Sequence, residues 1–168
     1  VHMFALDMQR IENRAISETN KLSYLLEMTE SLVSERVNSS MQLLKQSSLA
    51  IGEPSLAGSI VLSNKTIPKL MFGKESQTEQ ADLVDGVTSI ENGTATLFVK
   101  DNASFVRIAT NVRQKNGNRA VGTLLNPNGK VISYLQDGKS FYGVVDVLGE
   151  PYISGYEPIK NKSGTVIG

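Results

Sequence analysis

The sequence predicts an α/β (α+β) fold, in which one long N-terminal helix packs on an antiparallel sheet of about five to six strands. Residues 4–48 contain neither glycine nor proline, and their apolar side chains recur every three or four positions, as in an amphipathic helix. Residues 93–100 and 105–112 are rich in Val, Ile, Thr and Phe around a turn-like segment, which is a hairpin signal. Residues 140–148 and 152–159 repeat this pattern around a second turn.

A chain of 168 residues fits one domain that is large enough to bury a core. We expect residues 1–48 to form the helix and residues 49–168 to form the globular part, the two together being one structural unit. Residues 1–3 resemble the remnant of an expression tag. A helical hairpin is the alternative to one long helix, with its break near residues 17–20, where cap-forming side chains cluster.

The N-terminal part of the helix carries a narrow apolar stripe. Phe4, Met8, Ile11 and Ala15 are spaced by three and four residues, which is typical of a seam between two helices. Residues 22–44 are apolar over a broader arc, which suits a helix lying on a sheet. The stripe therefore predicts a homodimer through the N-terminal half of the helix.

Between the helix and the first hairpin the pattern is weaker. A short strand is expected around residues 60–62, and another over residues 68–73 with Pro68 as its first residue, where its missing N–H does no harm. Residues 74–80 are polar and predict a surface loop. Residues 81–90 carry apolar side chains at three- and four-residue steps, so a short helix is expected there.

The C-terminal half continues with turns and short elements. An Asn-Gly turn at residues 116–117 leads into a predicted strand over residues 119–125. A loop follows over residues 126–140, and residues 130–136 within it are long enough for one or two helical turns. Residues 165–168 read as the start of a final strand that is cut short.

Composition excludes several classes of function. Lysine plus arginine equals aspartate plus glutamate at 17 each, so no global field attracts nucleic acid. The chain has no cysteine and one histidine, His2, which argues against thiolate metal sites and Ser-His-Asp catalysis. No stretch reaches the ~18 apolar residues of a membrane span. We therefore expect no enzyme, no metal and no cofactor; an enzyme would need carboxylate or tyrosine chemistry.

Arg107 is the first candidate for a binding residue. It lies in the middle of an apolar strand, between Val106 and Ile108, where a guanidinium is costly to bury without an anionic partner. That partner is either an internal carboxylate, with Asp146 and Glu157 as candidates, or an anionic ligand. An edge position that reaches solvent is the third possibility.

Six other residues are candidates of the same kind. The tyrosines offer an apolar ring with one hydroxyl, which suits either a small polar ligand or core packing. Tyr152 and Tyr156 share one face of their strand, and Tyr142 lies on the neighbouring strand. The charged candidates follow turns or lie in a strand, where a solvated surface role is equally open. The full set of candidate ligand residues is Arg107, Arg119, Lys139, Tyr142, Asp146, Tyr152 and Tyr156.

Several spaced motifs of the second half resemble a known family. They are residues 105–112, residues 117–123, residues 138–143, residues 152–159 and residues 164–168. Together they look like the extracytoplasmic single Cache sensor domain of bacterial methyl-accepting chemotaxis receptors. The resemblance implies a PAS-like sheet whose strands wall a ligand cavity, a long preceding helix, and membrane spans that flank the domain in the full-length protein.

The implied function is a periplasmic sensor domain that binds an organic acid or an amino acid. Asp146 departs from the apolar or aromatic residue expected at its place, so a zwitterionic ligand follows if Asp146 and Arg107 both face the cavity. Two alternatives stay open. The domain serves a histidine kinase or diguanylate cyclase, or it is a ligand-free module that dimerises.

Overall fold

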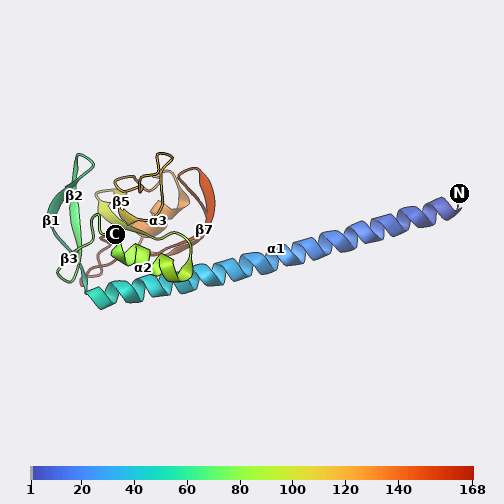
Figure 1. Ribbon diagram of the computed structural model, residues 1–168, viewed down its shortest axis with the longest axis horizontal. Coiled ribbons are helices and arrows are strands. Elements are labelled where there is room, and N and C mark those ends of the chain that lie inside the picture. The colour runs from blue at the N-terminus through green and yellow to red at the C-terminus, as the bar shows by residue number, and fades with distance from the viewer. Residues whose placement is uncertain (1) are drawn as a thin grey trace. The chain divides into compact units, whose positions relative to one another are not determined.

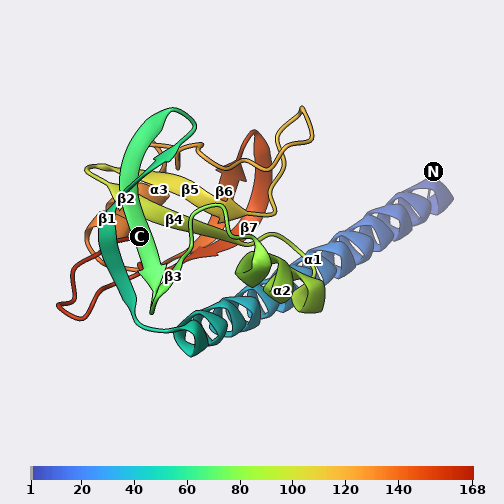
Figure 2. The ribbon, with the colours of Figure 1, turned by 60° about the vertical axis from the view of Figure 1, so that its left-hand side comes forward.

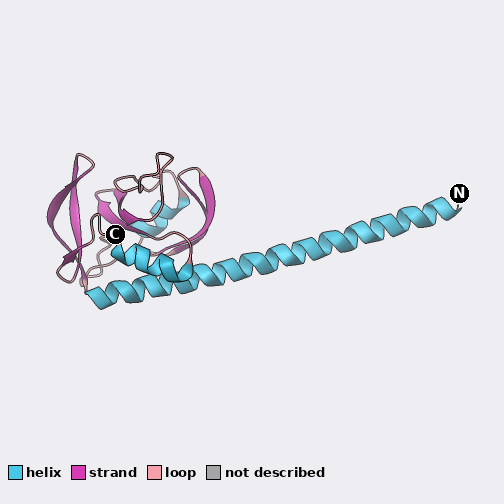
Figure 3. Ribbon diagram, in the orientation of Figure 1, coloured by secondary structure: helices cyan, strands magenta, loops and turns pink. Residues whose placement is uncertain are grey.

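The computed structural model describes the backbone of residues 2–168 and the side chains from residue 9 onward. Over this range the chain forms three helices and seven strands (Figure 1). The helices are α1 (His2–Ile51), α2 (Asp82–Glu91) and α3 (Lys130–Gln136). The strands are β1 (Pro54–Leu62), β2 (Lys65–Phe72), β3 (Glu75–Ser76), β4 (Thr96–Asp101), β5 (Ser104–Thr110), β6 (Phe141–Val147) and β7 (Glu150–Tyr156). All strand pairs are antiparallel, so the predicted α+β fold is confirmed (Figure 3). The strands form three separate sheets, β1-β2-β3, β4-β5 and β6-β7, where the sequence indicated one sheet of about five to six strands.

Helix α1 is continuous from His2 to Ile51, so the long helix is confirmed and the alternative with a break near residues 17–20 is wrong. The helix ends at Ile51, three residues later than predicted, and is followed by Gly52, whose φ of +152° no other residue type readily adopts. The chain divides into two compact units, Val1–Arg36 and Val37–Gly168. The division at residue 48 inferred from sequence stays a prediction.

The β1–β2 hairpin is longer than the sequence indicated. Its two strands pair over most of their length, with a bulge between Leu56 and Ser59 on β1. Pro68 lies opposite Ser59, inside β2, so its predicted place as first residue of a strand is wrong. The bulge explains why a proline is tolerated there, because pairing is already interrupted at that point.

Residues 74–80 do not form the predicted surface loop. Glu75–Ser76 pairs with the end of β2, and the N–H of Gln77 donates to the carbonyl of Leu70. These bonds bring Gln77 and Thr78 into the interior, where both are buried. Helix α2 then follows as predicted, with Leu83, Val84 and Val87 buried.

The β4–β5 hairpin lies between the β1–β2 hairpin on one side and the β6–β7 hairpin on the other (Figure 2). The predicted hairpins and helix α3 are confirmed.

The predicted strand over residues 119–125 is wrong. That segment makes single bridges to Arg113 and Val106, and Gly122 at a φ of +84° bends it out of strand geometry. Residues 165–168 likewise form one bridge, Lys160 with Val166, instead of a strand.

Two apolar clusters lie on opposite faces of the β4–β5 hairpin. The first contains Leu97, Val99, Val106 and Ile108, and it packs against β2 and α2 and against Leu44 and Ile51 of α1. The second contains Phe98 and Phe105 with side chains of α3, β6 and β7. The alternation of side chains along β4 therefore separates a face turned toward α1 from a face turned toward α3.

Candidate ligand-binding site

Arg107 lies on the α3-facing side of the β4–β5 hairpin. Cross-strand pairing places it opposite Phe98, and its guanidinium carbon sits 5.0 Å from the centre of the Phe98 ring. Only 3% of the residue is exposed. Its Nη1 donates to the hydroxyl of Thr123 at 3.0 Å and to the carbonyl of Leu124 at 2.9 Å. The side chain is thus held by neutral acceptors from the loop that follows β5.

No carboxylate compensates this charge within the part of the chain that the structure describes. The predicted internal salt bridge is wrong: Asp146 accepts a hydrogen bond from the N–H of Gly149, and Glu157 pairs with Lys45. The predicted edge position is wrong as well, because Arg107 is buried. Burial lowers the pKa of Arg107, and the neighbouring Tyr156 partly opposes that shift. Among the described residues, Nε and Nη2 have no hydrogen-bond acceptor, so two donor groups remain available.

Tyr156 adds a second donor beside Arg107. Its ring centre lies 6.3 Å from that of Phe98, and it packs against the same apolar cluster. Burial raises the pKa of Tyr156, while the charge of Arg107 lowers it. The phenol stays protonated near neutral pH, since its ordinary pKa is about 10. No described side chain or backbone group is bonded to its hydroxyl. A cation and a phenol in an apolar surrounding suit a small anion with an apolar body.

The other two candidate tyrosines lie on different faces of the β6–β7 hairpin. Tyr152 pairs with Val145 and Tyr156 pairs with Phe141, so both tyrosines share the α3-facing side. Tyr142 pairs with Gly155 and points to the opposite side, where its hydroxyl donates to Glu157 at 2.7 Å. The structure therefore brings Arg107 and Tyr156 together, places Tyr152 on their face, and separates Tyr142 from them.

The remaining charged candidates lie elsewhere. Asp146 pairs with Pro151, on the same face as Tyr142, and it caps the turn of its hairpin. Lys139 is exposed, and its Nζ is 3.8 Å from a carboxylate oxygen of Asp137. Neither lies beside Arg107. Their role as ligand contacts stays a prediction without geometric support.

Arg119 forms a bidentate ion pair with Asp85 of α2. Nη1 and Nη2 donate to the two carboxylate oxygens at 2.7 and 2.8 Å, and Nη1 also donates to the carbonyl of Thr110 at 2.9 Å. These hydrogen bonds hold the pKa of Asp85 below its usual value and raise that of Arg119. Arg119 thus joins the loop after β5 to α2.

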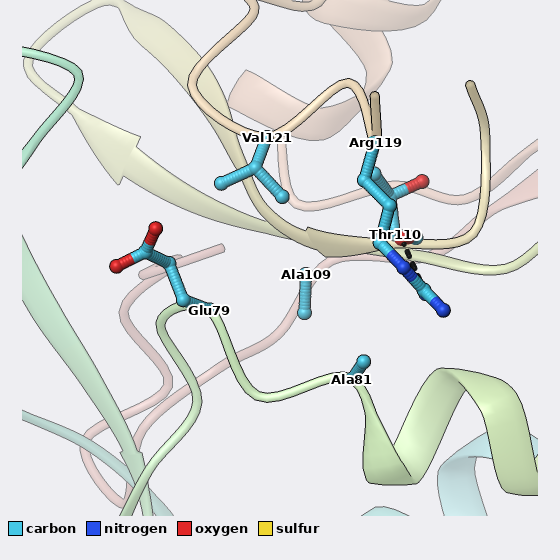
Figure 4. A pocket seen from close by; sticks show the side chains of 6 residues that line it. All are labelled: Glu79, Ala81, Ala109, Thr110, Arg119 and Val121. Carbon is cyan, nitrogen blue, oxygen red and sulfur yellow. Dashed lines mark hydrogen bonds between the residues drawn. The ribbon is translucent and has the colours of Figure 1, made fainter. Parts of the chain in front are cut away.

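A separate hollow of about 280 Å³ lies beside this ion pair. It is lined by Glu79, Ala81, Ala109, Thr110, Arg119 and Val121, with Glu79 and Arg119 at opposite sides (Figure 4). The guanidinium of Arg119 is already engaged by Asp85, and the hydroxyl of Thr110 is bonded to Thr96 at 2.7 Å. The hollow therefore offers an apolar floor and the carboxylate of Glu79, and the guanidinium in its wall is already paired.

Sequence reasoning missed Phe98, Thr123 and Leu124 as neighbours of Arg107. Phe98 could have been found, because the predicted turn at residues 101–104 sets a register that pairs it with Arg107. The carbonyl of Leu124 carries no sequence signal, since every residue has one. Glu79 was missed because its segment was interpreted as a surface loop.

The described residues offer neither a metal-binding cluster nor a membrane-spanning helix. They contain no group of three or more His, Cys, Asp or Glu side chains that could hold a metal ion. Among them, too, no helix combines the length and the apolar character needed to cross a membrane.

The comparison with known families agrees with the motifs of the second half. The model of the Cache 3/Cache 2 fusion domain matches residues 7–168, and this range includes most of α1 and all seven strands. No curated protein and no solved structure matches the chain at a significant level. The family match spans nearly the whole chain, so the resemblance to Cache domains is confirmed. The chain belongs to the Cache family of extracytoplasmic, ligand-binding sensor domains.

Proposed function

We propose that this Cache domain binds a small organic carboxylate at Arg107 and reports it through a transmembrane chemoreceptor. The observation that carries the proposal is the buried guanidinium without a carboxylate partner among the described residues. Burying a charge costs several kcal/mol unless an opposite charge accompanies it. A ligand carboxylate would supply that charge and would accept hydrogen bonds from the two unused donor groups of Arg107.

The geometry favours an organic acid over a zwitterion. The hydroxyl of Tyr156 can donate a second hydrogen bond to a ligand oxygen, and Tyr152 lies on the same face of the β6–β7 hairpin. Asp146, the residue proposed to recognise an amino group, lies on the other face of the hairpin. An amino acid would need another acceptor for its ammonium group. The zwitterion hypothesis therefore loses the residue on which it rested.

Thermal-shift screening tests the proposal. We expect at least one organic acid from a panel of mono-, di- and tricarboxylates to raise the melting temperature, because a ligand that binds only the folded state stabilises it. At a ligand concentration about 100 times the Kd, the gain is about 2.7 kcal/mol. For a domain of this size that corresponds to a rise of roughly 5–10 °C. The matching amides, which lack the negative charge, serve as controls. No shift from any carboxylate, or equal shifts from the amides, would refute the anion site.

The chemoreceptor context is part of the proposal. It is supported by the Cache family membership, whose domains sense solutes outside the cytoplasm. In this arrangement the domain lies on the periplasmic side, and membrane spans adjoin α1 and the C-terminal segment. A histidine kinase or a diguanylate cyclase would use the same sensor with a different output. Identifying the output domain of the full-length protein distinguishes these alternatives.

We also propose that α1 pairs with α1 of a second copy. The side chains of Phe4 and Met8 lie outside the described residues, so the predicted stripe is assessed from Ile11 onward. Its positions continue at heptad spacing, interrupted by the polar Glu18 and Thr29, through apolar residues that are each more than half exposed: Ile11, Leu22, Leu25 and Leu32. An exposed apolar row of this spacing is typical of a coiled-coil seam.

Disulfide trapping in the intact receptor tests this pairing. The described chain has no cysteine, so a single introduced thiol reports one position. We expect Ile11→Cys to give a cross-linked dimer on mild oxidation, because seam positions bring equivalent residues together. Asn13→Cys, on the opposite side of the helix, serves as the control. Equal cross-linking at both positions, or none at Ile11 and at Ala15, would contradict the seam.

A further inference from the structure

The outward face of the β6–β7 hairpin is joined to helix α1 by a three-residue chain. Tyr142 of β6 donates its hydroxyl proton to one carboxylate oxygen of Glu157 at 2.7 Å. The other oxygen of Glu157 lies 2.6 Å from the ammonium group of Lys45 on α1. Glu157 follows directly after β7, so this chain connects both strands of the hairpin to the helix.

Tyr142 reaches Glu157 because its cross-strand partner is a glycine. The ring of Tyr142 lies over Gly155, where an added Cβ would stand 2.5 Å from a ring carbon. Gly155 has an ordinary backbone conformation, so the close approach of the ring, not a special φ, requires glycine here. Gly155 therefore makes room for the Tyr142 ring and allows its hydroxyl to reach Glu157.

Glu157 is charged and well held in this contact. Its side chain is 17% exposed. Burial opposes ionisation, but hydrogen bonds from Lys45 and Tyr142 outweigh it and hold the pKa of the carboxyl below its usual value. Burial and the bond to Glu157 raise the pKa of Tyr142, so the phenol remains a donor. An ion pair that is partly shielded from water is stronger than an exposed one.

Tyr156 and Glu157, at the end of β7, face opposite sides of the β6–β7 hairpin. Tyr156 packs beside Phe98 and Arg107 on the α3-facing side. Glu157, the next residue, contacts Tyr142 and Lys45 on the α1 side. A displacement of the backbone at Tyr156 also moves Glu157, because one peptide bond joins the two residues.

From this arrangement we infer that Glu157 is a positioning residue that couples the candidate ligand site to helix α1. The inference rests on the proposed function for the role of Tyr156 as a ligand contact. The coupling itself is a property of the ligand-free domain. When Tyr156 shifts, Glu157 carries the shift to Lys45, and α1 changes its packing on the sheet by a discrete step. A ligand that leaves Tyr156 in place would bind without moving α1.

A double-mutant experiment with the ligand-free domain tests the coupling. The perturbation is Tyr156→Leu, and the readout is hydrogen exchange of the amides in residues 41–49 of α1. We expect Tyr156→Leu to speed this exchange about threefold to tenfold in the wild-type background and to have little further effect in Glu157→Gln. Non-additivity of this kind identifies residues that act together.

Asp101→Asn supplies the matched control. Asp101 is 14% exposed and pairs with Lys65 at 3.2 Å, so it resembles Glu157 in burial and in partner but lies at the turn of the β4–β5 hairpin. In the Asp101→Asn background, Tyr156→Leu should speed exchange in α1 as much as in the wild type. Equal effects of Tyr156→Leu in all three backgrounds, or no effect in any, would overturn the coupling. No ligand is used, so either result is independent of the carboxylate screen.

Discussion

Replacing Arg107 by methionine is expected to weaken carboxylate binding about 100-fold or more, while the melting temperature of the ligand-free domain changes little. A charge-assisted hydrogen bond contributes about 1.5–3 kcal/mol, and the ligand would lose two of them. Each 1.36 kcal/mol corresponds to a factor of ten. Calorimetric titration with the carboxylate identified by screening measures the loss, and thermal unfolding measures the stability.

The free energy of unfolding should change little, because Arg107→Met removes stabilising contacts and a desolvation penalty of similar size. Methionine removes two hydrogen bonds to Thr123 and Leu124 and the contact of the cation with the Phe98 ring. It also removes the desolvation penalty of a buried charge, which amounts to several kcal/mol. An unbranched apolar side chain can pack against the Phe98 ring in place of the guanidinium. We therefore expect the free energy of unfolding to stay within about 1 kcal/mol of the wild type.

Arg119→Met is the matched control for Arg107→Met. Arg119 contacts Asp85 and the carbonyl of Thr110 and does not contact Arg107. Its ion pair is partly exposed to solvent, so its loss should lower stability modestly and leave the affinity for the carboxylate unchanged. The site assignment would be wrong if Arg107→Met unfolded the domain at room temperature, or if both variants weakened binding equally.

Local sequence patterns were sufficient to predict an element where its own residues and flanking turns specify it. The β4–β5 hairpin and α3 carry strong turn and periodicity signals, and both form as predicted. Only residues 60–62 of strand β1 were predicted, because residues 55–59 are exposed and mostly small, and the bulge removes the two-residue alternation. Gln77 and Thr78 are buried by backbone pairing to β2, which hydropathy cannot reveal.

The same distinction applies to the site. Sequence alone indicated that Arg107, if buried among its apolar strand neighbours, needs an anionic partner, and it left an exposed edge position open. It could not identify those acceptors, since one is a backbone carbonyl and the other, Thr123, lies in a segment with no regular structure. Which face of the β6–β7 hairpin each tyrosine occupies depends on the turn that joins the two strands. Val147 pairs with Glu150 across a turn at residues 148–149, and this register sends Tyr142 and Tyr156 to opposite sides.

Gly52→Ala is expected to be the most destabilising single-methyl addition at the junction between α1 and the sheet. A Cβ at Gly52 would lie 2.5 Å from the Cα of Gly73, and the φ of +152° at Gly52 is unfavourable for alanine. Gly73 itself has a φ of +57°, and its N–H donates to the carbonyl of Glu53 at 2.9 Å. Two glycine backbones therefore touch where the helix turns into β1, and neither can move without breaking that bond.

Strain and overpacking each cost about 1–3 kcal/mol, so we expect Gly52→Ala to lower the free energy of unfolding by about 2–5 kcal/mol. The melting temperature should fall by roughly 5–15 °C. Gly86→Ala is the control, because Gly86 lies within helix α2 with nothing within 4 Å of an added Cβ. That variant should gain about 0.5–1 kcal/mol, since alanine has the higher helix propensity. If thermal unfolding shows both variants to be equally stable, the contact between Gly52 and Gly73 does not fix the junction between α1 and β1.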